Sequence, residues 1–462
     1  MFKSLISVAV LCLCIAPVRA DIHEFTLENG LKLLVKEDHR APVAVSQVWY
    51  KVGGSYESNG ITGISHVLEH MMFQGTPAYP DGEFSRIIAE NGGDENAFTS
   101  SDYTSYVQTL EKSRLPISFE LEADRMRNLI IAEKEFLKEI EVVKEERRWR
   151  TEDDPQSMTY EIAMATAFQT SPYRNPTVGW MADLETMTTD KLKQWYKKWY
   201  APNNATVVVA GDVKPEEVLA LAKKYFGKLK PEKIIAPEQR PEVQQQGIKR
   251  VTVRRPAEVP YFMMLYKTPG LKQAMKEESI EDWEPYALDV LSGILSGGGS
   301  ARFNSNLVRG QEIAASISSG YSMANRLEGY FLIEGMPTNG TTVEQLEQAV
   351  RAELDSLQNN LVSSEELERV KAQVVSSDVY ERDSVFYQAR ILGSLETVGL
   401  PWSLVDEYVG HIQKVTADQV RQVAKKYFID DLLTVAVLDP LPLEKPLRRG
   451  PPPGGPHNDV TR

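Results

Sequence analysis

The sequence has few residues with which to form disulfides or cross a membrane. Its two cysteines, Cys12 and Cys14, both lie within residues 1–20. The rest of the chain can therefore form neither an internal disulfide nor a thiolate metal site. Beyond residue 20 no apolar run reaches the roughly 18 residues that a transmembrane helix needs. We therefore expect no stable membrane span.

Positive charge is also in short supply. The chain has 52 lysine and arginine residues against 65 aspartate and glutamate residues, a net charge of −13. Such a surface is repelled by phosphate backbones and by anionic lipids. We therefore expect neither nucleic acid nor an anionic membrane as the main partner.

The first twenty residues have the pattern of a secretory signal peptide. Lys3 precedes an apolar run from Leu5 to Ile15, and Val18-Arg19-Ala20 places small residues before a cleavage point at Asp21. The alternative is an N-terminal anchor that is not cleaved. Export, acidity and the lack of further cysteine together indicate a bacterial periplasmic protein.

The pattern of strands and helices predicts an α+β fold. Alternating apolar residues on both sides of Asn29-Gly30 predict a hairpin. Residues 44–54 and 205–212 are typical of strands, and four segments have helical periodicity: 61–74, 82–91, 114–129 and 132–152. Because strands and helices do not alternate strictly, a doubly wound parallel sheet is not favoured.

An internal repeat predicts two similar domains. Residues 188–212 align with residues 416–440 without a gap, so that Thr188 matches Thr416 and Lys197-Lys198 matches Lys425-Lys426. The predicted organisation is a signal peptide (1–20), an N-terminal domain (21–229), a polar linker (230–256), a C-terminal domain (257–440) and a disordered Pro/Gly-rich tail (441–462).

Two of the six histidines lie in the segment GISHVLEHMMFQGT, residues 63–76. On a helix His66, Glu69 and His70 would share one face. Two imidazoles at this spacing can bind one zinc ion, and a neighbouring carboxylate can take a proton from water. The alternative is a buried helix with hydrogen-bonded histidines.

A catalytic zinc site needs a third protein ligand. The remaining histidines have no potential ligand partner nearby, which leaves a carboxylate. Glu139 and Glu146 are seven residues apart in KEIEVVKEERRWR, so they share a helix face. The alternative is a solvated charged helix, although Val142-Val143 between them indicates partial burial.

These motifs together resemble the pitrilysin/insulinase family of zinc peptidases, the inverzincins with H-x-x-E-H. The family has a further glutamate about 76 residues after its second histidine, within E-x-x-x-V-x-x-E. Glu146 stands at this distance from His70 and completes Glu139-x-x-x-Val143-x-x-Glu146. Residues 92–106, GGDENAFTSSDYTSY, and the two-domain repeat also resemble the family.

The resemblance implies a role for each of these residues. His66, His70 and Glu146 would bind one Zn²⁺ per chain, and Glu69 would act as the general base. Glu139 would orient a ligand imidazole. The two domains would form one half of a clamshell around a peptide chamber.

The resemblance also implies how a substrate is held. Asn96, Ala97 and Phe98 would lie on an edge strand to which an extended peptide adds as a further strand. The alternative is an ordinary internal strand followed by a polar turn.

The second domain departs from the pattern of single-chain relatives. Those relatives carry an arginine and, seven residues later, a tyrosine that contact the substrate. Here Arg309 is followed at that distance by Ser316, and Tyr321 does not match. The chain thus resembles the zinc-bearing subunit of two-subunit members such as mitochondrial processing peptidase. We expect a heterodimer with a similar-fold subunit that supplies an Arg/Tyr pair, or a homodimer.

The predicted function is zinc-dependent hydrolysis of peptides or unfolded protein segments. One alternative is a non-catalytic assembly subunit, although such relatives tend to lose the ligands or the general base. Another is a peptidase dedicated to one precursor peptide.

Overall fold

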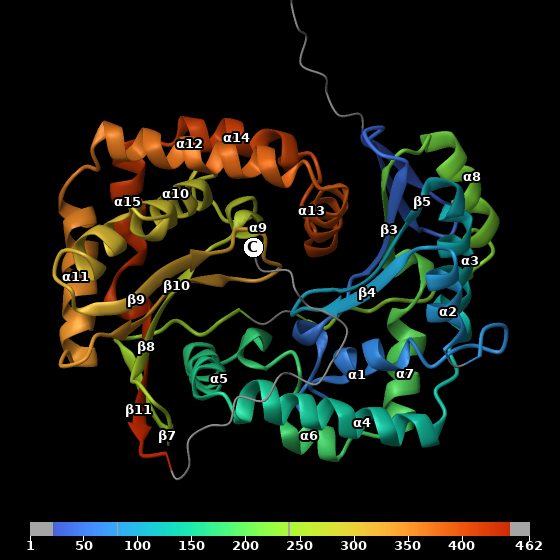
Figure 1. Ribbon diagram of the computed structural model, residues 1–462, viewed down its shortest axis with the longest axis horizontal. Coiled ribbons are helices and arrows are strands. Elements are labelled where there is room, and N and C mark those ends of the chain that lie inside the picture. The colour runs from blue at the N-terminus through green and yellow to red at the C-terminus, as the bar shows by residue number, and fades with distance from the viewer. Residues whose placement is uncertain (1–21, 81, 239–240, 444–462) are drawn as a thin grey trace, which may run out of the picture.

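The computed structural model describes residues 22–80, 82–238 and 241–443, which fold into two sheets with helices packed around them (Figure 1). The predicted signal peptide and residues 444–462 of the predicted tail lie outside this range. The predicted α+β class with two similar units is confirmed. No helix within the described ranges combines the length and the apolar character that crossing a membrane requires.

The first sheet has six strands in the order β1-β2-β6-β3-β5-β4. All neighbours are antiparallel except β2 and β6. The predicted hairpin around Gly30 joins β1 to β2. The strands are β1 (Ile22–Thr26), β2 (Lys32–Glu37), β3 (Val43–Tyr50), β4 (Asp94–Thr99), β5 (Thr104–Glu111) and β6 (Ala205–Gly211).

The second sheet has five strands in the order β7-β11-β8-β10-β9, in which only β11 and β7 are parallel. The strands are β7 (Lys249–Pro256), β8 (Tyr261–Thr268), β9 (Ala314–Tyr321), β10 (Gly329–Pro337) and β11 (Leu433–Leu441).

Fifteen α-helices are found in the described part of the chain. In the first half they are α1 (Ile64–Met71), α2 (Glu83–Glu90), α3 (Leu115–Asn128), α4 (Glu133–Arg147), α5 (Pro155–Ala167), α6 (Met181–Glu185), α7 (Thr189–Trp199) and α8 (Pro215–Tyr225). In the second half they are α9 (Leu271–Ala274), α10 (Glu284–Ser296), α11 (Val343–Asn359), α12 (Ser364–Glu381), α13 (Val385–Val398), α14 (Leu404–Lys414) and α15 (Ala417–Tyr427).

The repeat has a common local structure. Thr188 caps α7 by accepting a hydrogen bond from the N–H of Lys191, and Thr416 caps α15 in the same way through Gln419. Each helix then leads into a buried strand, β6 or β11. The two halves of the chain thus build the same helix-strand unit into separate sheets.

Each half of the chain contributes one helix that packs against the sheet of the other half. Helix α5 packs against β7, β8 and β11, whereas α13 packs against β3 and β6. Trp49 of β3 and Leu395 of α13 belong to one continuous buried cluster, which spans both halves. This exchange fixes the position of the two halves relative to one another (Figure 1).

The linker between the two units is shorter than the range 230–256 that the sequence suggests. Residues 249–256 form β7, whose partner is β11. Because β7 is an edge strand with Arg250, Arg254 and Arg255 on its surface, its sequence looks like polar linker. Within the linker, the Glu242 carboxylate accepts hydrogen bonds from three backbone N–H groups at residues 169–171.

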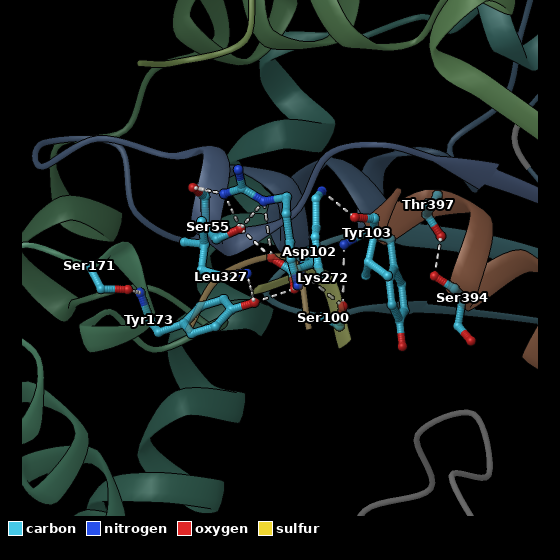
Figure 2. A network of polar contacts seen from close by, with 12 residues as sticks. Ser55, Ser100, Asp102, Tyr103, Ser171, Tyr173, Lys272, Leu327, Ser394 and Thr397 are labelled. Atoms are coloured by element: carbon cyan, nitrogen blue, oxygen red, sulfur yellow. Dashed lines mark hydrogen bonds and ion pairs between the residues drawn. The ribbon is translucent and has the colours of Figure 1, made fainter. Parts of the chain in front are cut away.

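A buried polar network also joins the two halves (Figure 2). Asp102, in the turn after β4, accepts hydrogen bonds from Ser55 Oγ (2.6 Å), from the hydroxyl of Tyr173 and from the backbone N–H of Arg326 (3.0 Å). The Arg326 guanidinium lies 3.3 Å from Asp102 Oδ1 and covers the ring of Tyr56. The turn that follows β4 is therefore anchored directly to the second half.

Candidate metal centre

Helix α1 presents both histidines of the H-x-x-E-H motif. Gly63 precedes the helix with a φ of 84°, and a side chain there would collide with the backbone of Val178. The buried carboxylate of Glu57 accepts hydrogen bonds from the N–H groups of Gly63 (2.7 Å) and Ser65 (2.8 Å). The start of the helix is thereby fixed, and with it the direction of His66 and His70.

Helix α4 packs against α1 and brings Glu146 to the two histidines. Its Oε2 lies 3.6 Å from Nε2 of His66 and 3.4 Å from Nε2 of His70. Among the described residues, these three form the one cluster with the geometry of a metal site, their ligand atoms lying within 4.8 Å of one another.

This donor set fits zinc. Two ligand atoms that each lie about 2.0–2.1 Å from a tetrahedral zinc ion are about 3.4 Å from one another. The distances from Oε2 of Glu146 to Nε2 of His66 and of His70 are close to this value. Two imidazoles and one carboxylate are also a known combination for a catalytic zinc ion, which keeps one position open.

Glu139 lies beside His70, as the resemblance implies for an orienting group. Its Oε2 is 3.3 Å from Nδ1 of His70, while its Oε1 accepts a hydrogen bond of 3.0 Å from Gln74. The contact fixes the ring of His70 with Nε2 directed at Glu146. In contrast, Nδ1 of His66 is buried without a hydrogen-bond partner among the described residues.

The charges of the cluster depend strongly on one another. Burial and the neighbouring His70 lower the pKa of His66 to about 4. Burial also acts to lower the pKa of His70, but hydrogen bonds to Glu139 and Glu146 raise it to about 9. Burial opposes ionisation of Glu146, yet the two histidines hold its pKa at about 2. Glu146 is therefore ionised at neutral pH, as a ligand of a cation must be.

The carboxylate of Glu69 lies next to the edge strand. Thr99, the last residue of β4, donates a hydrogen bond of 2.5 Å to Oε2 of Glu69. Burial raises the pKa of Glu69, while this hydrogen bond acts in the opposite direction. A buried carboxylate with a raised pKa is suited to accept a proton.

Sequence reasoning missed two residues of this centre. One is Thr99, which lies within the segment 92–106 that resembles the family, but its contact with Glu69 follows only from the fold, which brings β4 next to α1. The other is Arg150, whose guanidinium lies 2.9 Å from Oε1 of Glu146. Its spacing of four residues from Glu146 on a helix could have indicated the pair.

The predicted substrate residues lie on β4, which is an edge strand paired only with β5. Ala97 faces the core beneath α1, and its N–H donates a hydrogen bond of 2.8 Å to Oδ1 of Asn96. Phe98 points to the other face, where its ring contacts Trp49 and Tyr103 edge to face.

Arg309 lies in the second half, directly after the short π-helix η6 (Phe303–Val308). Its guanidinium donates hydrogen bonds to the carbonyl of Gly299 and to Ser305 Oγ (3.2 Å). Ser316 lies on β9, and the hydroxyl of Tyr321 donates to the carbonyl of Pro269 (2.5 Å). Arg309 and Tyr321 are thus both bound within the second half.

Family models and solved structures resemble this chain over most of its length. The model described as Insulinase (Peptidase family M16) matches residues 32–179, and the model described as Peptidase M16 inactive domain matches residues 186–374. The chain is 32% identical to the zinc protease PqqE of Helicobacter pylori, a match that covers 90% of this chain and 92% of that protein.

Two further comparisons extend this result. The crystal structure of a protease from Helicobacter pylori has a TM-score of 0.85 at 30% identity, covering 91% of this chain and 100% of that chain. A probable mitochondrial-processing peptidase subunit beta of Arabidopsis thaliana is 27% identical over 90% of this chain and 78% of its own length.

The fold consists of two linked α+β units, and the first unit carries the H-x-x-E-H motif. This combination is that of a class of metallopeptidases. The chain belongs to the insulinase family of zinc peptidases, peptidase family M16. Its two units correspond to one half of a clamshell.

Proposed function

We propose that the chain is a zinc-dependent endopeptidase that cleaves peptides or unfolded protein segments. The observation that carries the proposal is the convergence of His66, His70 and Glu146, with Glu69 hydrogen-bonded to the adjoining edge strand. Zinc held by these three residues would supply Lewis acidity toward a water molecule and a carbonyl group.

The residues of the chain have separate roles in this reaction. Glu69 takes a proton from the attacking water and passes it to the leaving amine. Glu139 keeps the ring of His70 in place through Nδ1. The free edge of β4 pairs with the substrate backbone, which gives affinity with little dependence on sequence.

The cleft would be completed by a second subunit, either a similar-fold partner that supplies an Arg/Tyr pair or a second copy of this chain. Arg309 supports this proposal because its guanidinium is turned onto Gly299. The relative from Arabidopsis thaliana is itself named as a subunit. The signal-peptide pattern of residues 1–20 supports a periplasmic location for this reaction.

Two alternative functions use the same fold. A non-catalytic assembly subunit would have no need of Glu69, Glu146 and both histidines together, so their convergence favours the enzyme. A peptidase dedicated to one precursor peptide would differ from the proposed enzyme only in its substrate. Such an enzyme would leave a panel of unrelated unfolded peptides uncleaved, whereas the proposed enzyme would cleave them.

Metal analysis combined with a quenched-peptide assay tests the proposal. The variant Glu69→Gln should bind one zinc ion per chain as the parent does, while its kcat falls by about a thousandfold or more, because the general base is lost. The exposed Glu90→Gln on α2 serves as the matched control. Hydrolysis by Glu69→Gln at the parental rate would refute the mechanism.

The partner is tested separately, by size-exclusion chromatography with activity measured across the fractions. Activity should follow a species larger than one chain. Full activity in the monomer fraction would contradict the need for a second subunit.

A further inference from the structure

A cavity of about 860 Å³ lies in the second half of the molecule, between α10, α12, α13, α14 and the end of β9. None of the metal-centre residues His66, Glu69, His70, Glu139 and Glu146 lines it. Its volume is in the range of cavities that hold small organic ligands.

One basic side chain of the first half reaches this cavity. Lys36 of β2 lies on the strand face that also carries Leu34, which is part of the core shared by both halves. Lys36 is 6% exposed, and no hydrogen bond or ion pair joins its Nζ to a described residue. Lys32, on the same face, instead pairs with Glu24 (3.0 Å) and Glu396 (2.9 Å).

Most of Lys36 is buried, but its Nζ is not among the fully buried atoms, so the ammonium group borders the cavity without a partner among the described residues, which is unfavourable. Burial and the charge of Arg382 both lower the pKa of Lys36, and more distant carboxylates offset this only in part. The ammonium group of Lys36 is therefore free to bind an acceptor.

The nearby carboxylates already have donors. Arg382 contacts Asp378 (2.8 Å) and Asp406 (3.5 Å), and Arg40 contacts Asp38 (2.6 Å). The hydroxyl of Tyr408 donates to the buried Asp289 at 2.6 Å. Lys36 is therefore the basic group that an acceptor entering the cavity can meet. Because several carboxylates surround it, a singly charged acceptor is favoured over a dianion such as phosphate.

The rest of the lining favours an apolar ligand body. Three helices, α12, α13 and α14, contribute apolar side chains to the lining: Val370, Val374, Ile391, Leu395, Leu404 and Val405. Oε1 of Gln388, also in the lining, is buried without a donor. It could accept an N–H group from the ligand.

We propose that this cavity binds a monoanionic carboxylate with an apolar body, with the carboxylate on Nζ of Lys36 and the body against α12, α13 and α14. The site goes beyond the proposed peptidase reaction and does not depend on the metal centre. A free fatty acid and the carboxyl terminus of an apolar peptide share this chemistry.

Isothermal titration calorimetry on the purified, zinc-loaded chain tests the site. Decanoate should bind at least tenfold more tightly than decanol, which has the same body without the charge. The variant Lys36→Met keeps the apolar stem and should lose this preference. Lys32→Met, on the same strand face, should retain it. Equal binding of decanoate and decanol to the parent chain, or binding of neither, would overturn the proposal without any variant.

A second pair of ligands distinguishes the two sources of the carboxylate. If the site takes peptide termini, N-acetyl-leucyl-leucine should bind and its C-terminal amide should not. If it takes free acids, decanoate alone should bind. Unchanged decanoate affinity in Lys36→Met would contradict both. The same titration on Glu69→Gln should match the parent, so that failure of this site and failure of the peptidase proposal are separate results.

Discussion

The hydroxyl of Thr99 donates a hydrogen bond of 2.5 Å to Glu69, although the two residues are 30 positions apart in the chain. Thr99 is the last residue of the edge strand β4, and Glu69 lies between the two histidines of α1. The contact therefore couples the strand that would hold a substrate to the group that would accept the proton.

Thr99→Val should lower kcat for peptide hydrolysis by about tenfold, because it removes a hydrogen bond to a charged group, worth about 1.5–3 kcal/mol, at nearly constant volume. Zinc content should not change, since no metal ligand is altered. Steady-state kinetics and metal analysis measure the two effects. Thr109→Val on β5 is the control, and an equal loss in both variants would contradict a specific role for Thr99.

Glu139→Gln should weaken zinc binding by about 10- to 100-fold, the range seen when a partner of a ligand histidine is replaced. The physical reason is that an amide holds the Nδ1–H of His70 less strongly than a carboxylate does. Competition with a chelator of known affinity measures the change. Glu141→Gln, on the same helix but exposed and paired with Lys144, should retain the parental affinity.

Glu242→Gln should lower the free energy of unfolding by about 3 kcal/mol at pH 7, because it leaves Lys267 buried without its partner 3.0 Å away. Burial opposes ionisation of Glu242, but three backbone N–H groups and Lys267 hold its pKa at about 2. This is below the value of about 4.3 in an unfolded chain. Its contribution is therefore complete above about pH 5 and is lost as the pH falls toward 2.

Urea unfolding of Glu242→Gln at several pH values measures this dependence. The difference from the parent should shrink between pH 5 and pH 3. Glu238→Gln, in the same linker, should show no difference at either pH. If the difference in unfolding free energy between the parent and Glu242→Gln stayed constant with pH, the charge of Glu242 would not be the source of the stability.

Asp102→Asn should destabilise the chain by about 3 kcal/mol, because Arg326 loses its buried counter-charge. Combining it with Arg326→Met should cost less than the sum of the two single changes, since both remove one ion pair. Urea unfolding of the four proteins gives the coupling energy. Additive effects would show that the pair does not connect the halves energetically.

Much of the metal centre could be predicted from the sequence because its parts are local or periodic. The spacing of His66, Glu69 and His70 fixes their common face on a helix, and the same holds for Glu139 and Glu146. The predicted pairing of these two segments agrees with the position of α1 against α4. The separation of 76 residues between His70 and Glu146 was informative only through the resemblance to a family.

The boundaries between elements were less predictable. The sequence predicts linker where the edge strand β7 forms, because charged residues that protect an exposed edge resemble those of a solvated chain. The strand predicted to carry Asn96, Ala97 and Phe98 ends at Thr99, and a turn leads from it into β5. The hairpin depends on pairing within the sheet, and alternation of side chains does not reveal it.

The sequence by itself determined the type of chemistry and the existence of two related units, since helical spacing and a repeat are properties of the chain alone. Only the tertiary structure decided which distant groups meet: Thr99 with Glu69, Asp102 with Arg326, and Lys36 with the cavity of the second half. These contacts join residues from different sheets and helices. Their positions follow from packing of the whole core, including the exchange of α5 and α13, and no local pattern encodes that packing.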